Sequence, residues 1–263
     1  MAMGTPEVDA RIKDREREFH DRRFAAAIDP RASLSKYYSV TYESKEFYRS
    51  TIRTNAPDQS RILEYGCGDV TGNIAFYKSL NCDFYGIDIS SEAIKKAKAI
   101  AENEGFSAKY SVADAESTNL PSDYFDLTMG SGILHHLNID RSMEELRRVT
   151  KQAGSCVFFE PLGHNPLINL FSSLTPRVRS SDEHPLREED FETMARYFRR
   201  VEVSYFHFFA LGAVIFRRIG LFDSLLEVSS RIDAYLTKKY GWFGKYCWIC
   251  VVRLSQPIKN LDI

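Results

Sequence analysis

The sequence lacks an excess of charge of either sign. Its 35 lysines and arginines are balanced by 36 aspartates and glutamates, which leaves a formal net charge of −1. A nucleic-acid-binding domain usually carries a basic footprint on one face, so we expect no nucleic-acid partner. At 263 residues the chain can bury a full hydrophobic core without a disulfide or a metal ion to stabilise it.

Long apolar runs are also missing. The longest, at 205–216, is interrupted by His207 and is too short to span a bilayer. The charged N-terminus has no apolar stretch of the kind that marks a secretory signal peptide. We therefore expect a cytoplasmic protein with no integral membrane segment. Peripheral contact with a membrane surface is an alternative, because Arg217 and Arg218 lie beside apolar residues.

Cysteine is scarce, and the five cysteines form no zinc-ligand set. The one Cys-x-x-Cys pair, Cys247 and Cys250, lies inside the apolar segment 246–254, which has the composition of a strand. We expect buried thiols in a reducing compartment rather than a redox site. Since the sequence shows no carboxylate cluster beyond the residues assigned below, we expect no metal cofactor.

Short apolar strands alternate with helical segments through the middle of the chain. This alternation is typical of the α/β class, with a parallel sheet covered by helices on both faces. The strands are predicted at 62–65, 83–88, 108–112, 125–130 and 155–160, and the helices at 73–80, 90–103 and 140–150.

We divide the chain into three parts. Residues 1–55 form an N-terminal helical lid, 56–161 form the ligand-binding core, and 162–263 complete the sheet. The last part carries cap insertions at about 162–187 and 209–244, where the alternation breaks. The remaining predicted elements are helices at 7–27, 41–54, 187–197 and 211–240 and strands at 201–208 and 246–254.

The loop after the first strand of the core carries the strongest ligand signal. Ligands of open parallel sheets bind beyond the carboxyl ends of the strands. At this end Glu64 precedes Gly66, Cys67 and Gly68, and the glycines let the main chain approach a ligand closely. A glutamate is unfavourable beside a pyrophosphate and favourable beside an ammonium group.

Polar residues also follow the next three strands. Asp88 closes the second strand, next to Ile89, and can accept hydrogen bonds from two ribose hydroxyls. Asp114, followed by Ala115, can accept a hydrogen bond from the exocyclic amine of a purine. Ser131 follows the fourth strand.

The same glycines and aspartate also occur in nicotinamide-dependent oxidoreductases. A pyrophosphate site of that class requires Gly-x-Gly-x-x-Gly, whereas the third position here is Thr71. We therefore keep the oxidoreductase as the less favoured alternative.

The motifs taken together resemble the class I S-adenosylmethionine-dependent methyltransferases, of the small-molecule, type 11-like kind. The stretches are Glu-Tyr-Gly-Cys-Gly at 64–68, Gly-Ile-Asp at 86–88, Ala-Asp-Ala at 113–115 and Ser-Gly-Ile-Leu-His-His-Leu at 131–137. The resemblance implies a Rossmann-like methyltransferase fold, with a mostly parallel seven-stranded sheet and a helical cap, and S-adenosylmethionine as cofactor. It also implies the cofactor-binding set Glu64, Gly66, Cys67, Gly68, Asp88, Ile89, Asp114, Ala115 and Ser131.

One position departs from the family. The family usually continues Gly-Cys-Gly with Thr-Gly, whereas Asp69 and Val70 follow here and the next glycine is Gly72. We expect this departure to change the geometry of the loop more than the identity of its ligand.

Methyl transfer needs an acceptor held in line with the sulfonium methyl and, for some acceptors, a base. His135 and His136, one turn beyond the fourth strand, are the predicted catalytic bases; packing at a strand–helix junction is their alternative role. Further residues can contact the acceptor from the cap regions: Tyr38, Glu160, His164 and His184.

The sequence thus predicts methyl transfer to O, N or C of a small, apolar, natural-product-like or lipid-like acceptor. The apolar, aromatic composition of the two insertions suggests the acceptor pocket; a larger core or a dimer interface is the alternative. We expect a monomer or a homodimer. The competing function on the same fold is a cofactor-binding enzyme that does not methylate, such as a cyclase, or a binding scaffold.

Overall fold

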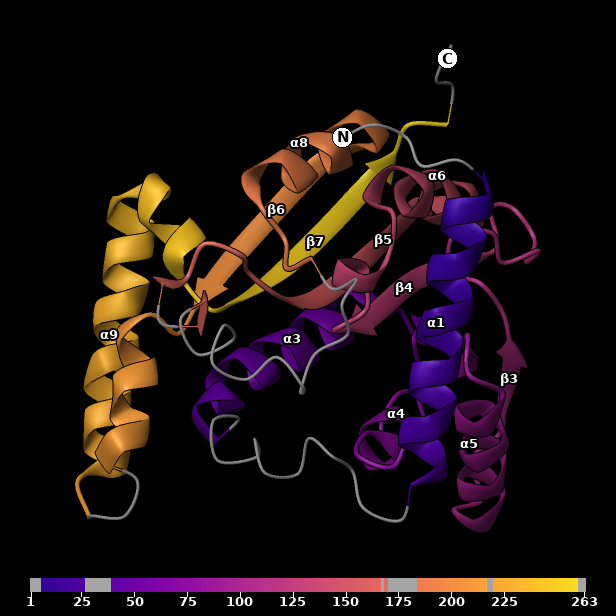
Figure 1. Cartoon of the computed structure of the whole chain (residues 1–263), viewed down its shortest axis with the longest axis horizontal. Helices are drawn as coiled ribbons and strands as arrows, with labels where there is room; N and C mark the ends of the chain where they lie inside the picture. The colour runs from indigo at the N-terminus through magenta and orange to yellow at the C-terminus, as the bar shows by residue number, and fades with distance from the viewer. Residues whose placement is uncertain (1–5, 27–38, 167, 170–183, 217–219, 260–263) are drawn as a thin grey trace.

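The computed structural model describes residues 6–26, 39–166, 168–169, 184–216 and 220–259. A seven-stranded sheet with the order β3-β2-β1-β4-β5-β7-β6 forms its centre (Figure 1). The strands are β1 (Ser60–Tyr65), β2 (Cys82–Asp88), β3 (Ala108–Val112), β4 (Phe125–Ser131), β5 (Thr150–Pro161), β6 (Phe198–Phe206) and β7 (Ile249–Pro257). The first five pair in parallel, whereas β7 is antiparallel to β5 and β6. The predicted α/β fold with a mostly parallel seven-stranded sheet is confirmed.

Helices cover both faces of the sheet because its central strands are apolar on both sides. In β1, Ile62 packs into one core cluster with Ile52 and Ile94, and the next residue, Leu63, packs into the other with Met143. The helices are α1 (Pro6–Ala25), α3 (Tyr42–Asn55), α4 (Ile74–Lys78), α5 (Ser91–Asn103), α6 (Ile139–Val149), α8 (Glu188–Tyr197) and α9 (Phe222–Lys239). Shorter 3-10 helices are η2 (Ser39–Thr41), η3 (Leu134–His136), η5 (Phe209–Phe216) and η6 (Gly241–Tyr246).

The region predicted to be helical at 211–240 contains two described elements, the 3-10 helix η5 and the α-helix α9. Asp233 of α9 explains how they are held together. Its buried carboxylate accepts hydrogen bonds from the backbone N–H groups of Phe208, Phe209 and Ala210, at 2.9, 2.9 and 3.2 Å. These N–H groups at the start of η5 would otherwise lack partners, so the carboxylate fixes η5 against α9.

Three further expectations concern the Cys-x-x-Cys pair, membrane-spanning segments and contact with a membrane surface. Cys247 and Cys250 are buried, free thiols, and burial raises the pKa of Cys247 to about 12. No helix in the described ranges is both long enough and apolar enough to cross a membrane. Arg217 and Arg218, named above for contact with a membrane surface, lie outside the described residues.

Candidate functional site

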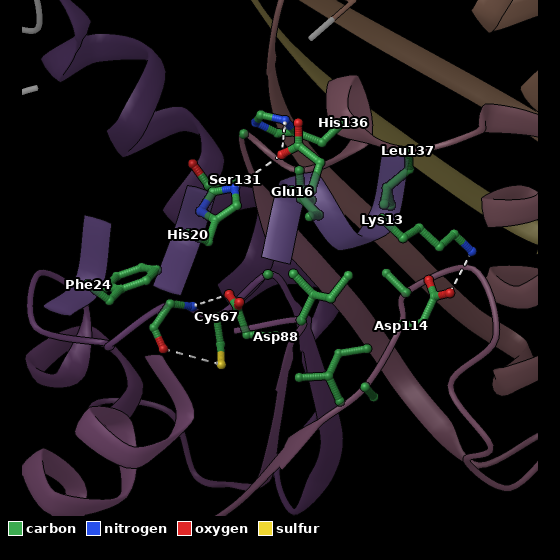
Figure 2. Close-up of a pocket in the computed structure, with 18 of the residues that line it drawn as sticks. Lys13, Glu16, His20, Phe24, Cys67, Asp88, Asp114, Ser131, His136 and Leu137 are labelled. Carbon is green, nitrogen blue, oxygen red and sulfur yellow. Dashed lines mark hydrogen bonds and ion pairs between the residues drawn. The ribbon is translucent and has the colours of Figure 1, made fainter. Parts of the chain in front are cut away.

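A cavity of about 470 Å³ lies at the carboxyl ends of the parallel strands. Its lining comes from the loop after β1, the ends of β2 and β4, the loop after β3, the η3 region and one face of α1 (Figure 2). In Figure 1, α1 stands beside α5, between the labels of β4 and β3. The volume is in the range of small-molecule and cofactor sites.

The loop after β1 needs glycine at two positions. Gly66 and Gly68 have φ angles of +64° and +55°, a region that residues with a Cβ rarely adopt. A Cβ on Gly66 would lie 2.9 Å from Cδ1 of Ile133, and one on Gly68 would lie 3.2 Å from Cζ of Phe24. The backbone N–H of Cys67 donates to the carbonyl of Ile87, at 3.0 Å, and so joins the loop to β2. Both glycines and Cys67 line the cavity, so the main chain itself forms this wall.

Val70 stands where the resemblance predicts a third glycine, and it keeps the glycine-like backbone. Its φ is +58°, which is an outlier for a β-branched residue. The side chain is buried in the core, and the carbonyl accepts the N–H of Ile74 at the start of α4, at 3.1 Å. The Asp69–Val70 departure therefore preserves the course of the loop and adds strain at one residue.

Asp88 links the glycine loop to the start of α5. One carboxylate oxygen accepts the N–H of Gly68 and the other accepts the N–H of Ser90, both at 2.9 Å. A carboxylate oxygen can accept more than one hydrogen bond, and Asp88 lines the cavity beside Ile89. The residue thus organises the loop and retains acceptor capacity for ligand hydroxyls.

Asp114 is engaged by the N-terminal helix. Its carboxylate contacts Nζ of Lys13 at 2.5 Å, and Lys13 also pairs with Glu116 at 2.8 Å (Figure 2). The other oxygen of Asp114 accepts the N–H of Glu116, at 2.9 Å. Asp114 and Ala115 line the cavity, so α1 is joined by an ion pair to the predicted adenine-binding loop.

Glu64 does not line the cavity. The side chain is 4% exposed, and one of its oxygens accepts the hydroxyl of Tyr77. Burial raises the pKa of Glu64 to about 8, opposed by that hydrogen bond and reinforced by the charge of Asp88. The second oxygen, Oε2, is buried without a hydrogen-bond partner in the described structure. Glu64 therefore holds a potential negative charge behind the glycine loop rather than at the cavity surface.

The two candidate bases differ in position. Nδ1 of His135 contacts the fully buried Glu160 at 2.8 Å, and neither side chain lines the cavity. The other oxygen of Glu160 accepts the N–H groups of Ile133 and Leu134, both at 2.9 Å. Glu160, predicted as an acceptor contact, thus fixes the loop that leads from β4 into η3. His136 is the imidazole of the pair that lines the cavity.

His136 meets two side chains of α1. Its Nδ1 lies 3.3 Å from Oε2 of Glu16, and Nε2 of His20 lies 3.5 Å from the same oxygen. Figure 2 shows the three side chains pointing toward one another across the cavity wall. The cavity thus brings together two residues of α1 and one of η3 that lie far apart in the sequence.

The remaining predicted residues fall into three groups. Ser131 and His184 line the cavity, and the N–H of His184 donates to the carbonyl of His135, at 2.9 Å. His164 lies in the turn after β5, outside the cavity lining. Tyr38 is outside the described residues. Among the described residues of the two insertions, His184 alone lines this cavity.

The N-terminal lid predicted at 1–55 includes α1, but the residues of α1 that line the cavity were not assigned from the sequence. One face of the helix lines the cavity over more than three turns. The signal that was available is spacing, because positions 12, 13, 16, 20, 23 and 24 recur at three and four residues. These cavity-lining residues are Ile12, Lys13, Glu16, His20, Arg23 and Phe24.

The side chains present fit a nucleoside that carries a cation. Asp88 and Asp114 offer acceptors for hydroxyl and amine groups, and glycines at 66 and 68 leave space that a Cβ would fill. The partnerless Oε2 of Glu64 places a buried carboxylate behind the same loop, where a cationic ligand would favour its charged form.

Comparison with known proteins agrees with this arrangement. Residues 63–158, from β1 into β5, match the family model described as a methyltransferase domain. The ubiquinone/menaquinone biosynthesis C-methyltransferase of Neisseria meningitidis serogroup C is 26% identical over 117 residues, which cover 44% of this chain and 48% of that protein. The chain spans about half the length of the curated relatives it matches.

Solved structures share the fold at low sequence identity. Phosphoethanolamine N-methyltransferase 2 of Haemonchus contortus, in complex with phosphomonomethylethanolamine and S-adenosylhomocysteine, gives a TM-score of 0.62 at 15% identity. The match covers 92% of this chain and 60% of that one. The cyclase SpnF gives a TM-score of 0.54 at 16% identity, over 82% and 83% of the two chains.

The predicted resemblance and the predicted cofactor are both confirmed. The family match spans the glycine loop, Asp88, Asp114 and the η3 region, which form the cavity together with α1 and His184. Residues 63–158 of this chain therefore match a methyltransferase domain, and the chain shares its fold with S-adenosylmethionine-dependent methyltransferases.

Proposed function

We propose that the chain transfers the methyl group of S-adenosylmethionine to an O, N or C atom of a small molecule. The observation that carries the proposal is the shared cavity, which joins the nucleoside-binding carboxylates to an imidazole from the η3 region. When bound, the cofactor supplies an electrophilic methyl group on a sulfonium. The chain has to bind it, orient the acceptor and manage the acceptor proton.

The carboxylates act at the nucleoside end of the cofactor. Asp88 holds the glycine loop against the start of α5, and its remaining lone pairs can accept hydrogen bonds from ribose hydroxyls. Asp114 is bonded to Lys13, and an adenine amine is a second donor that suits this carboxylate. Lys13 also pairs with Glu116, so α1 can remain attached while Asp114 accepts from the base.

Proton removal falls to His136 in this proposal. Its ring lines the cavity, whereas the ring of His135 bonds to Glu160 behind the loop. His135 and Glu160 are then positioning residues, because they hold the η3 region from which His136 projects.

The acceptor we propose is apolar in part and polar at its reacting end. Apolar lining comes from Ile12, Phe24 and Leu137, and polar groups cluster around His136. The described aromatic side chains of the insertions do not line this cavity, so they give less support to the predicted apolar acceptor than the sequence suggested.

Calorimetry and label transfer test the proposal. The protein should bind S-adenosylmethionine and S-adenosylhomocysteine, with no response to NAD. Label from a methyl-labelled cofactor should pass to the small-molecule fraction of a metabolite extract, with one S-adenosylhomocysteine formed per methyl transferred. Cofactor binding with an altered acceptor and no label transfer would favour the cyclase-like alternative, and tight NAD binding alone would refute the methyltransferase.

Substitution of Asp88 tests the cofactor site. Asp88→Asn removes the charge from this acceptor, and a hydrogen bond to a charged group contributes about 1.5 to 3 kcal/mol. We expect affinity for S-adenosylhomocysteine to fall about 10- to 100-fold. Asp83→Asn, at the exposed opposite end of β2, is the matched control and should bind normally. Circular dichroism verifies that both variants fold.

A further inference from the structure

We propose that Glu16, His20 and His136 form a binding site for a divalent transition-metal ion on the α1 side of the cavity. One ligand atom from each side chain lies within 4.8 Å of the other two. The sequence shows no carboxylate cluster that predicts such a site, because this group consists of two imidazoles and one carboxylate from separate parts of the chain.

The distances suit direct coordination. Oε2 of Glu16 lies 3.3 Å from Nδ1 of His136 and 3.5 Å from Nε2 of His20. A zinc ion with tetrahedral ligands at about 2.0 to 2.2 Å holds neighbouring ligand atoms roughly 3.3 to 3.6 Å apart. Two of the three pairs already have this spacing, and a small rotation of one imidazole would bring in the third.

The backbone holds the three ligands on two elements. Glu16 and His20 are four residues apart on α1, so they project from the same face of the helix. His136 ends η3, whose approach to the cavity is fixed by Glu160 through Ile133 and Leu134. The side chains of all three are largely buried, with 8%, 18% and 7% exposed for Glu16, His20 and His136.

The donor set indicates which ion would bind. Imidazole favours Zn²⁺, Fe²⁺, Ni²⁺ and Cu²⁺, whereas Mg²⁺ and Ca²⁺ prefer oxygen ligands alone. Two histidines and one carboxylate leave at least one coordination position free, as in catalytic rather than structural zinc sites. Since all three residues line the cavity, the free position faces the space where a substrate can bind.

The effect of such an ion on the reaction rests on the methyl transfer proposed above. An acceptor hydroxyl bound to the ion would lose its proton to water more readily than a free hydroxyl. Its oxygen then bonds to the methyl carbon, while the carbon–sulfur bond breaks and leaves its electron pair on sulfur. In the ion-loaded protein His136 is a ligand rather than a base, and the acceptor class narrows to molecules with a hydroxyl group.

Metal titration of the whole chain tests the site without relying on turnover. Protein stripped with a chelator and dialysed is titrated with Zn²⁺ by calorimetry, and we expect about one ion bound per chain. Glu16→Gln, His20→Ala and His136→Ala should each weaken this binding by about tenfold or more. His164→Ala, which removes an imidazole outside the cavity, is the matched control and should bind as the unaltered protein does.

Each outcome decides the proposal. No saturable Zn²⁺ binding, an affinity of Glu16→Gln and His136→Ala equal to that of the unaltered protein, or a loss in His164→Ala as large as in the site variants would each overturn it. Circular dichroism verifies that the variants fold. S-adenosylhomocysteine affinity of the unaltered protein, measured without metal, separates the two proposals: cofactor binding without metal binding rejects this site alone, and the absence of both rejects the proposed function as well.

Discussion

Val70 combines a strained backbone with a well-buried side chain. Its φ of +58° costs about 1 to 2 kcal/mol for a residue with a Cβ. Burial of a valine side chain, here 3% exposed, returns about 1.5 to 3 kcal/mol. The two contributions are of similar size, so the loop can tolerate valine where the usual family pattern has glycine.

This balance predicts an unusual order of stability at position 70. Val70→Ala loses apolar burial and keeps the strain, whereas Val70→Gly loses slightly more burial but relieves the strain. We therefore expect Val70→Gly to unfold at a higher denaturant concentration than Val70→Ala. Val157, buried in β5, is the control, because in a strand glycine should be about 0.5 to 1 kcal/mol worse than alanine. The same order at both positions would contradict the strain argument.

Glu64 makes the stability of the protein depend on pH. Its pKa is 4.5 in the ordinary state and about 8 when folded, so between these values the folded chain holds a proton that the unfolded chain has lost. The folded state therefore binds more protons, and stability falls as the pH rises from 4.5 to about 8. The Glu64 contribution is fully present below pH 4.5 and lost above the folded pKa.

Glu64→Gln should remove this dependence. The amide still accepts the Tyr77 hydroxyl but cannot ionise, so we expect the variant to gain stability over the parent as the pH approaches 8 to 9. Denaturant unfolding at pH 6 and pH 9 measures the difference. The parent should also bind S-adenosylmethionine, a cation, more tightly as the pH rises, with a weaker trend for neutral S-adenosylhomocysteine. Parallel stability curves for parent and variant would refute the assignment.

At the scale of elements, α1 is attached to the core by polar contacts at both ends. Lys13 pairs with Asp114 and Glu116, Asp21 accepts the hydroxyl of Ser90, and Lys96 donates to the carbonyl of Phe24. The Lys13 pair is partly exposed, 27% and 30% for its two side chains, so it contributes about 0 to 1 kcal/mol. We expect contacts of this strength to let α1 open and close over the cavity.

Hydrogen exchange should detect the opening of α1. Without cofactor, Lys13→Met removes one attachment, and the amides of α1 should exchange up to about fivefold faster. Arg17→Ala is the matched control on the same helix, because Arg17 pairs with Asp14, within α1 itself, at 2.9 Å. Equal exchange in the two variants would mean that Lys13 does not restrain the helix.

At the scale of the whole molecule, cofactor binding and folding are linked. The cavity collects residues from α1 and from four strand ends, so it exists only in the folded chain. S-adenosylhomocysteine at 100 times its dissociation constant should therefore add about 2.7 kcal/mol to the unfolding free energy. Denaturant unfolding with and without this ligand measures the gain, which Asp88→Asn should reduce; an unchanged midpoint in the parent would contradict the cofactor site.

The sequence predicted those site residues that directly follow an apolar strand in the chain. Strands buried on both faces appear as apolar runs, and ligands of parallel sheets bind where these runs end. Gly66, Gly68, Asp88 and Asp114 could therefore be assigned to one site before any contact was known. The split between η5 and α9 was missed because Asp233, which joins them, lies inside the apolar pattern of α9.

The other site residues depend on tertiary contacts that the sequence does not show. Lys13, Glu16 and His20 follow a helical pattern that looks the same whether a face meets water or a cavity, and their partners lie about 100 residues further along the chain. The direction of a side chain at a strand end is equally hidden from sequence. Glu64 and Glu160 both looked like ligand contacts, and both are buried behind the loops they support.

The position of β7 has a consequence for synthesis on the ribosome. β7 follows β6 in the chain but lies between β5 and β6 in the sheet, and in the described structure it is the strand to which β6 is paired. Until residues 249–257 emerge, a nascent chain can complete the cofactor half of the sheet while the outer edge of β5 stays open. Unpaired edges recruit other chains, so we expect the arrival of β7 to protect the growing protein from aggregation by closing this edge.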